Sequence, residues 1–262
     1  DRRLERISYD GAPVVRNALD FVYAQLPERQ AMLYRALGVI PGSSFSVWAA
    51  AALLDGDPED TQDDLEELRA LSLLECDDQE QYRFHDLVRL HARAFPVPDA
   101  EERLLRLAEW YRLHGAYADR AVLEPARLRV SGDDELVAGR PNPFDRDSAT
   151  RWLERERANI LAVLRESARR GWNAIVVSLC DSPLWALHQL HKHYAETIEA
   201  LHYAVTAARD EQDLVAEARM RTLLVRLHME CGDFDAAHAE AAQARRVAEQ
   251  SGHRRVQASA AE

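Results

Sequence analysis

The strongest constraint on the fold is a short β-hairpin that runs directly into an amphipathic helix. Leu73–Cys76 and Gln81–Phe84 have the composition of two strands, and Asp77-Asp78-Gln79-Glu80 forms the polar turn between them. The apolar spacing of His85–Phe95 then predicts a helix. No other segment of the sequence makes a convincing strand, so the rest of the chain is expected to consist of helices and loops.

Helices are predicted before the hairpin. Helical periodicity indicates Val14–Leu26 and a second helix from Pro27 to Gly38, with the proline suited to its first position. Two further helices are expected over Ser46–Leu54 and Pro58–Leu71. Three helices, a two-stranded wing and a closing helix make up a winged helix.

A helical region is predicted after the boundary at Pro96-Val97-Pro98. A long helix is expected over Asp99–Ala118, and the stretch Ser131–Asp147, rich in Gly, Pro and Asp, is expected to be an extended loop. Ser148 is the predicted N-cap of the next helix. The apolar stripe of that helix consists of Trp152, Leu153, Ile160, Leu161 and Leu164.

A repeat signal lies towards the C-terminus. Gly232-Asp233-Phe234, followed by Ala237 and Ala244, fits the tetratricopeptide pattern of an aromatic turn between two closely packed helices. We expect Phe234 to be buried at that turn. An earlier, degenerate copy consists of His193-Tyr194, Thr197 and Ala204. Because about three such units are needed for a stable solenoid, we expect the array to be longer in the parent protein.

These predictions give a mostly α fold class, with a winged-helix domain followed by a helical bundle and a tetratricopeptide-like α-solenoid. The expected domains are a helical lead-in at residues 1–26 and a winged helix at 27–96. A helical linker region at 97–180, with a long loop near 131–147, precedes repeats at 181–262.

The run Arg83-Phe84-His85-Asp86 resembles the Met-His-Asp motif of signal-transduction NTPases of the STAND/AP-ATPase (NB-ARC) class, with Phe84 at the Met position. That motif closes the winged helix of the family. Phe21–Pro27, Leu33–Gly38 and Pro41-Gly42 resemble the entry to the same domain, so the resemblance covers roughly residues 14–95. The pattern is most similar to actinobacterial antibiotic-pathway transcriptional regulators, in which such a module precedes tetratricopeptide repeats.

A second run, Trp152–Ile160, resembles the linker of the same regulators, in which W-L-x-x-E-x-x-N is common. A helix core with solvated charges explains the same residues without any special role.

In this family the histidine contacts bound ADP and holds the off state. The resemblance therefore implies that His85 senses the nucleotide in the intact protein, with Asp86 supporting its ring. ADP or ATP would be the cofactor of an NTPase domain that lies outside this chain. The alternative reading is structural: His85 packs near the wing, and Asp86 only caps the following helix.

Catalytic chemistry has no support in the sequence. A P-loop needs a glycine-rich run that ends in Gly-Lys, and the single lysine, Lys192, lies between two histidines. The sequence also contains no Gly-x-Ser-x-Gly elbow. We therefore expect this chain to have no catalytic residues and no cofactor of its own, and not to be an enzyme.

Metal and membrane sites are not expected either. The three cysteines have no Cys-x-x-Cys spacing, which is typical of reduced thiols in a cytoplasmic protein. His188 and His191 share a helix face, but His193 points elsewhere, so we predict no metal site. No apolar run approaches the ~18 residues that indicate a membrane span.

The net charge of −12 opposes contact with nucleic acid. The helix in the place of a recognition helix has no basic residue before Arg69. Its carboxylates are Asp57, Glu59, Asp60, Asp63, Asp64, Glu66 and Glu67. Because phosphates would repel these groups, we expect this winged helix not to bind DNA.

The preferred function is a regulatory and protein-interaction segment of a bacterial signal-transduction NTPase that acts in transcriptional control. Its expected partners are the NTPase domain of the same protein and a protein or peptide at the repeats, and a homo-oligomer is left open. One alternative is a free-standing tetratricopeptide adaptor, which an upstream P-loop in the full gene would disfavour. A second is a DNA-binding winged-helix regulator, which a basic surface stripe would favour.

Overall fold

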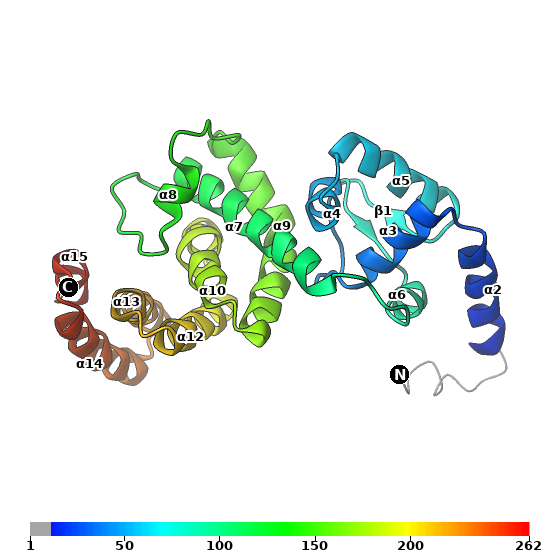
Figure 1. Cartoon of the computed structure of the whole chain (residues 1–262). Coiled ribbons are helices and arrows are strands. Elements are labelled where there is room, and N and C mark those ends of the chain that lie inside the picture. Colours follow the sequence, from blue (N-terminus) through cyan, green and yellow to red (C-terminus); the bar gives the residue numbers. More distant parts are fainter. Residues whose placement is uncertain (1–11, 262) are drawn as a thin grey trace. The chain divides into compact units, whose positions relative to one another are not determined.

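The structure is a computed structural model that describes residues 12–261, and most of these residues are helical (Figure 1). The predicted mostly α fold class is confirmed. The described part of the chain forms two compact units, which divide between Trp110 and Tyr111. Helix α7 (Ala100–Val122) runs from the first unit into the second. The finer division into four domains stays a prediction.

Six helical and hairpin segments of the N-terminal unit follow the predicted order. They are α2 (Ala12–Ala24), α3 (Glu28–Gly38), α4 (Val47–Leu54), α5 (Pro58–Ala70), the hairpin of β1 (Glu75–Cys76) and β2 (Tyr82–Arg83), and α6 (Asp86–Ala92).

Polar caps fix where α4 and α5 begin. The Ser46 hydroxyl accepts a hydrogen bond from the amide of Ala49 at 3.3 Å. The Asp57 carboxylate accepts from the amide of Glu59 at 2.8 Å, and Pro58 occupies the first helical position. Both features satisfy backbone donors that a helix start would otherwise leave without partners.

The hairpin is shorter than predicted because its first residues end helix α5. Ser72 adopts a left-handed conformation with φ 57°, and the amide of Leu73 bonds back to the carbonyl of Leu68 at 3.0 Å. The antiparallel pairing that follows joins Glu75 to Arg83 and Cys76 to Tyr82. Phe45 extends the ladder, because its amide and carbonyl both bond to Tyr82.

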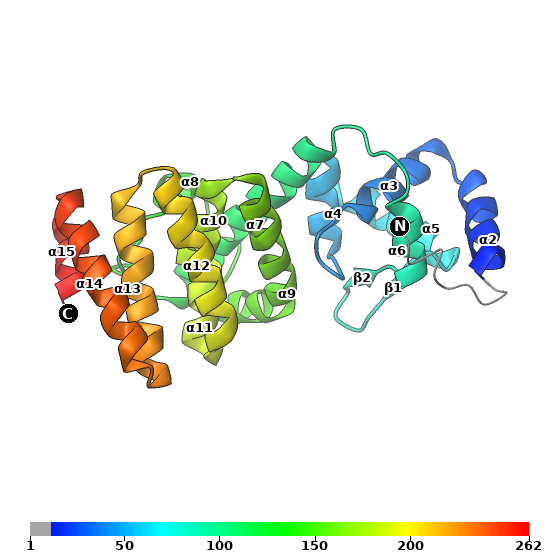
Figure 2. The ribbon, with the colours of Figure 1, turned by 90° about the horizontal axis from the view of Figure 1, so that it is seen from below.

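Ten segments follow in the C-terminal part of the chain. They are α7, α8 (Asp133–Val137), α9 (Arg146–Arg170), α10 (Asn173–Leu179), the π-helical turn η1 (Cys180–Leu184), α11 (Trp185–His191), α12 (Tyr194–Asp210), α13 (Leu214–Cys231), α14 (Phe234–Ser251) and α15 (Arg254–Ala261). Figure 2 shows α12, α13 and α14 lying side by side, as expected of a helical repeat.

The helices of this repeat end at a regular interval. A residue in the left-handed region terminates each helix every 20 or 21 positions, and a new helix starts within a few residues. These residues are Gly171, Lys192, Gln212, Gly232 and Gly252, with φ between 56° and 77°. The even spacing produces helices of similar length that can stack.

One helix of the repeat contains a wide turn. α10, η1 and α11 form a continuous helix from Asn173 to His191, and Pro183 lies inside the π-helical turn. Proline has no amide proton to donate, and π-turns commonly accommodate such interruptions. Gly115 of α7 packs against this proline, and a Cβ atom added at Gly115 would lie 2.6 Å from Pro183 Cγ. The predicted domain boundary at residue 180 falls inside this helix.

Three local predictions for this unit need correction. The stretch Ser131–Asp147 contains helix α8, which Asp133 anchors by its buried carboxylate. Asp145, rather than Ser148, is the N-cap of α9, and the two residues form a reciprocal capping box. Phe234 is 64% exposed instead of buried. As the first residue of α14 it lies at the edge of the helix pair, whereas Ala237 and Ala244 pack inside.

The W-L-x-x-E-x-x-N run contains a buried polar cluster, not a solvated charge. Glu156 on α9 has no exposed surface. Its Oε2 atom accepts hydrogen bonds from Tyr111 Oη and Asn159 Nδ2, each at 2.8 Å. Burial and the nearby Glu156 carboxylate raise the pKa of Tyr111. The run therefore fastens α9 to α7.

Glu230 on α13 fastens the turn between α11 and α12. Its carboxylate accepts hydrogen bonds from Lys192 Nζ, Tyr194 Oη and Arg226 Nε, each at 3.1 Å. His188 Nε2 lies 3.7 Å from the same carboxylate. Partial burial raises the pKa of Glu230, but the three hydrogen bonds outweigh it and bring the pKa down to about 2.

The pKa of Glu230 predicts a dependence of stability on pH. A carboxylate whose folded-state pKa lies below its ordinary value of 4.5 stabilises the fold above that pH. The stabilisation is lost as the pH falls towards 2. The difference in unfolding free energy between the native chain and Glu230→Gln, from urea titrations, should therefore shrink from about pH 7 to about pH 3. The matched variant Glu249→Gln, at an exposed position of α14, should show no such trend.

Close packing of α14 against α13 predicts a second effect. Ala237 is 2% exposed, so Ala237→Leu adds methylenes where no space exists and should lower stability by roughly 1–3 kcal/mol. Ala239→Leu, at an exposed position of the same helix, should leave the thermal midpoint almost unchanged. Equal midpoints for both variants would contradict the close helix contact.

Candidate functional site

The candidate site is the junction where β2 passes into α6. Phe84 and His85 are neighbours in extended chain, so their side chains point to opposite sides. Phe84 is 8% exposed and joins an aromatic cluster with Tyr34 and Phe45, at ring-centroid distances of 5.4 and 6.4 Å. The His85 side chain, by contrast, is 74% exposed. The core thus holds the junction and leaves the imidazole in solvent.

A carboxylate that the sequence analysis did not consider orients this imidazole. Glu75 on β1 lies close to His85, with 3.0 Å between its Oε1 atom and His85 Nε2. The other carboxylate oxygen accepts a hydrogen bond from Arg83 Nε at 2.8 Å. The hydrogen bond from Arg83 contributes most to lowering the pKa of Glu75, and His85 lowers it further. Cross-strand pairing of residues 75 and 83 brings these groups together.

Asp86 is the first residue of α6, and His85 is its N-cap residue without a side-chain capping bond. A carboxylate in the first turn of a helix is favourable because backbone amides at that end carry partial positive charge. Within residues 12–261 the structure shows no hydrogen bond between Asp86 and the His85 ring. The supporting role of Asp86 in the intact protein stays a prediction.

Arg89 of α6 and Arg93, the C-cap residue of this helix, bind the chain at the end of α3. Arg89 Nη2 donates to the carbonyl of Ile40 at 2.7 Å and also to those of Pro41 and Gly42. Arg93 Nε donates to the carbonyl of Gly38 at 2.8 Å. These carbonyls belong to the end of α3 and the turn after it, where helix geometry leaves acceptors unpaired. Burial, and then the neighbouring Arg93, lower the pKa of Arg89.

A polar relay connects the same helix to α2. Tyr34 Oη donates to the carbonyl of Val88 at 3.0 Å and lies 2.8 Å from His91 Nδ1. His91 Nε2 lies 3.0 Å from Asp20 Oδ1 on α2. His91 is buried, and each of its ring nitrogens has a polar partner inside the unit. The sequence analysis missed this relay, because its members are far apart in the chain.

The carboxylates of α5 differ in their exposure, and several have partners, including Asp60 at 3.7 Å from Arg29. Asp64 lies 2.7 Å from Arg29, and Glu66 accepts a hydrogen bond from Tyr82 Oη at 2.6 Å. Four of the carboxylates, those of Glu59, Asp60, Asp63 and Glu67, belong to exposed residues. The exclusion of DNA from this helix stays a prediction.

The histidines near Cys180 have structural surroundings. His188 is buried and its ring stacks on Trp185, with 5.4 Å between ring centroids, while burial lowers its pKa. His191 Nε2 lies 2.6 Å from a Glu154 carboxylate oxygen. No group of His, Cys, Asp or Glu side chains suited to a metal ion occurs among the described residues. In the same part of the chain, no helix is long and apolar enough to cross a membrane.

Comparison with known proteins gives two close relatives in sequence. The regulatory protein AfsR of Streptomyces griseus is 34% identical over 256 residues, which cover 93% of this chain and 25% of that protein. AfsR of Streptomyces coelicolor is 34% identical over 264 residues, which cover 94% of this chain and 26% of that protein. This chain is homologous to a segment of AfsR regulatory proteins. It spans about a quarter of the length of these relatives.

The homology with AfsR confirms the predicted resemblance to bacterial regulators. No protein-family model matches the chain. Among solved structures, a match was found to a Signal Transduction ATPase with Numerous Domains (STAND) protein with a tetratricopeptide repeat sensor from Pyrococcus horikoshii. It is 14% identical, covers 92% of this chain and 47% of that chain, and has a TM-score of 0.33.

The geometry of the junction predicts a contrast between two of its residues. His85→Ala should change the unfolding free energy by less than about 0.5 kcal/mol, because the side chain is mostly exposed. Arg89→Ala leaves backbone carbonyls without their donor and should cost about 1–3 kcal/mol. Urea unfolding of both variants measures the difference. A His85→Ala loss as large as that of Arg89→Ala would show that the imidazole belongs to the core.

Proposed function

We propose that this chain is a regulatory and protein-interaction segment of a bacterial signal-transduction NTPase that acts in transcriptional control. In this proposal the N-terminal unit is a winged helix that senses the nucleotide state of an NTPase domain. The helical repeat receives a protein or peptide partner. Homology with AfsR regulatory proteins supports the regulatory class, and the exposed, rigidly supported His85 supports the sensing role.

The chemistry of the junction suits contact with a phosphate. An imidazole N–H that leaves Glu75 for a phosphate oxygen exchanges one anionic acceptor for another, so its donor stays satisfied. Glu75 keeps its hydrogen bond with Arg83, so its charge stays compensated. The exchange therefore needs only a rotation of the exposed His85 side chain.

The contacts behind the junction suit the transmission of such a signal. Arg89 and Arg93 couple α6 to the end of α3, and the relay through Tyr34 and His91 couples α6 to Asp20 on α2. A displacement of His85 would therefore be passed from α6 to α2 and α3 through these direct hydrogen bonds. We propose that nucleotide exchange moves α2, α3 and α6 together as one body.

Catalysis is assigned to the NTPase domain of the same protein. The sequence of this chain contains no P-loop, since its one lysine is Lys192. We propose that the chain alone is not an enzyme and that ADP or ATP is a cofactor of the neighbouring domain. The exposed carboxylates of α5 further support a winged helix that contacts protein instead of DNA.

The test is the rate of ADP release from a protein that contains both this chain and its NTPase domain. His85→Ala should accelerate release, because a hydrogen bond to a charged group contributes about 1.5–3 kcal/mol, equivalent to about 10- to 100-fold. Stopped-flow measurement with a fluorescent ADP analogue gives the rate.

The matched control is Gln79→Ala, at an exposed position in the turn of the same hairpin, which should leave ADP release unchanged. Calorimetric titration of this chain alone with ADP should show negligible binding. An unaltered release rate in His85→Ala would refute the sensing role, while leaving the regulatory homology in place.

A further inference from the structure

A segment between α7 and α8 lies across the helical repeat. We call residues 123–132 the strap. Its central residues alternate in character: Arg127 and Arg129 are basic, whereas Leu128 and Val130 are apolar. In extended chain such residues face opposite sides. The strap can therefore contact charged groups with one side and an apolar surface with the other.

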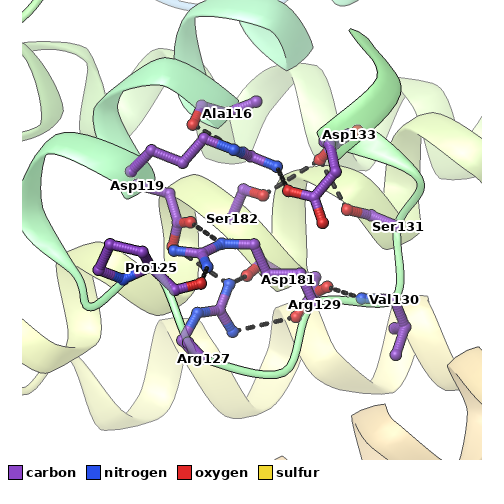
Figure 3. Close-up of polar contacts among 12 residues, drawn as sticks. Ala116, Asp119, Pro125, Arg127, Arg129, Val130, Ser131, Asp133, Asp181 and Ser182 are labelled. Carbon is purple, nitrogen blue, oxygen red and sulfur yellow. Dashed lines mark hydrogen bonds and ion pairs between the residues drawn. The ribbon is translucent and has the colours of Figure 1, made fainter. Parts of the chain in front are cut away.

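The basic side of the strap meets two buried aspartates. Arg127 donates to Asp119 Oδ1 of α7 at 3.1 Å and to Asp181 Oδ1 of η1 at 3.2 Å (Figure 3). Arg129 Nε donates to the second Asp119 oxygen at 2.5 Å. The amide of Val130 donates to Asp181 Oδ2 at 2.7 Å. Both aspartates are 0% exposed.

The apolar side of the strap covers helices α13, α14 and α15. Leu128 and Val130 pack against a buried cluster of the repeat. The cluster consists of Ala218, Val247, Ala248 and Val256. Arg255 of α15 also donates to the strap carbonyl of Ala126 at 3.1 Å. The strap thus binds the repeat by side chains on both faces and by its backbone.

The negative charges beneath the strap, on Asp119 and Asp181, are complementary to the positive charges of its arginines. Asp181 has two cationic neighbours, Arg127 of the strap and Arg219 of α13, the latter at 4.0 Å. Burial raises the pKa of Asp119, and the two strap arginines oppose this effect. Buried carboxylates without such partners would be strongly unfavourable. An extended segment that replaced the strap would therefore have to supply arginines at the same alternate positions.

We propose that the strap is a built-in ligand of the repeat and that the surface beneath it is a binding site for extended peptides with alternating arginine and apolar residues. The site consists of Asp119 and Asp181 beside the apolar cluster of α13, α14 and α15. A partner peptide of this chemistry binds after the strap is displaced. This inference rests on the proposed partner-binding role of the repeat. The strap site involves neither His85 nor a nucleotide. A result that refutes peptide binding therefore leaves the nucleotide-sensing proposal untouched, and the reverse also holds.

The experiment measures binding of a fluorescent peptide with the sequence of residues 123–132 to the 262-residue chain. In the release variant Leu128→Ser/Val130→Ser the strap loses its apolar contacts. This variant should bind the peptide at least about tenfold more tightly than the intact chain, a difference of about 1.4 kcal/mol. The matched variant Glu124→Ser/Ala126→Ser, altered at exposed strap positions, should bind like the intact chain.

A second peptide tests the charge requirement. The same sequence with both arginines replaced by alanine should not bind the release variant. If the release variant keeps its helical circular dichroism and cooperative melting yet binds the native peptide no more tightly than the intact chain does, the proposal is wrong. Equal binding of the arginine and alanine peptides would also overturn it.

Hydrogen exchange in the intact chain gives a test that needs no variant. Displacement requires the strap to open without global unfolding, so the Val130 amide should exchange faster than amides in the core of α13, such as Leu224. If Val130 exchanges only through global unfolding, the strap is a permanent brace and the proposal fails.

Discussion

Compensation of buried carboxylates governs the C-terminal half of this protein. Asp119, Asp133 and Asp181 have no exposed surface. A carboxylate without water needs several donors close by, and each of these three accepts hydrogen bonds from groups outside its own helix. Asp133 accepts from Arg112 of α7 at 3.1 Å and from Ser178 of α10 at 2.7 Å. The positions of α7, α8 and η1 are therefore set by charge as well as by shape.

The N-terminal half relies on a different interaction. Its core contains edge-on aromatic rings, such as Tyr34 against Phe84 with centroids 5.4 Å apart. Two of its arginines, Arg89 and Arg93, donate to the carbonyls at the end of α3 and in the turn after it. The buried neighbour Phe84 holds the backbone of His85 in place, while the His85 side chain stays exposed beside Glu75.

Local sequence patterns predicted the elements whose cause is local. Ser46 and Pro58 mark helix starts because capping depends on the next few residues, and Ala237 and Ala244 are buried because helix contacts need small side chains. The exposure of Phe234 was not predictable from the repeat pattern, because its position at the first residue of α14 places it outside the contact.

Interactions between distant residues were not predictable in the same way. Glu75 faces His85 because of strand register, and the Asp119–Arg127–Asp181 contacts depend on how helices pack. Glu156 occupies a run of charged residues that predicts a solvated surface, and its burial is favourable because Tyr111, Asn159 and Arg155 lie against its carboxylate. The candidate site was thus located from a motif, while the groups that support it required the structure.

The π-helical turn at Cys180–Leu184 sets the rotational phase of the helix that contains it. Each residue advances an α-helix by about 100°, and a π-turn holds an additional residue, so everything after it is rotated relative to everything before. Ser178, before the turn, faces Asp133, and His188, after it, faces Glu230. Ser178 and His188 can face these partners at the same time only with the present number of residues between Ser178 and His188. An insertion or deletion here would rotate one half of the helix away from its neighbours, so the number of residues in this turn is a structural requirement in its own right.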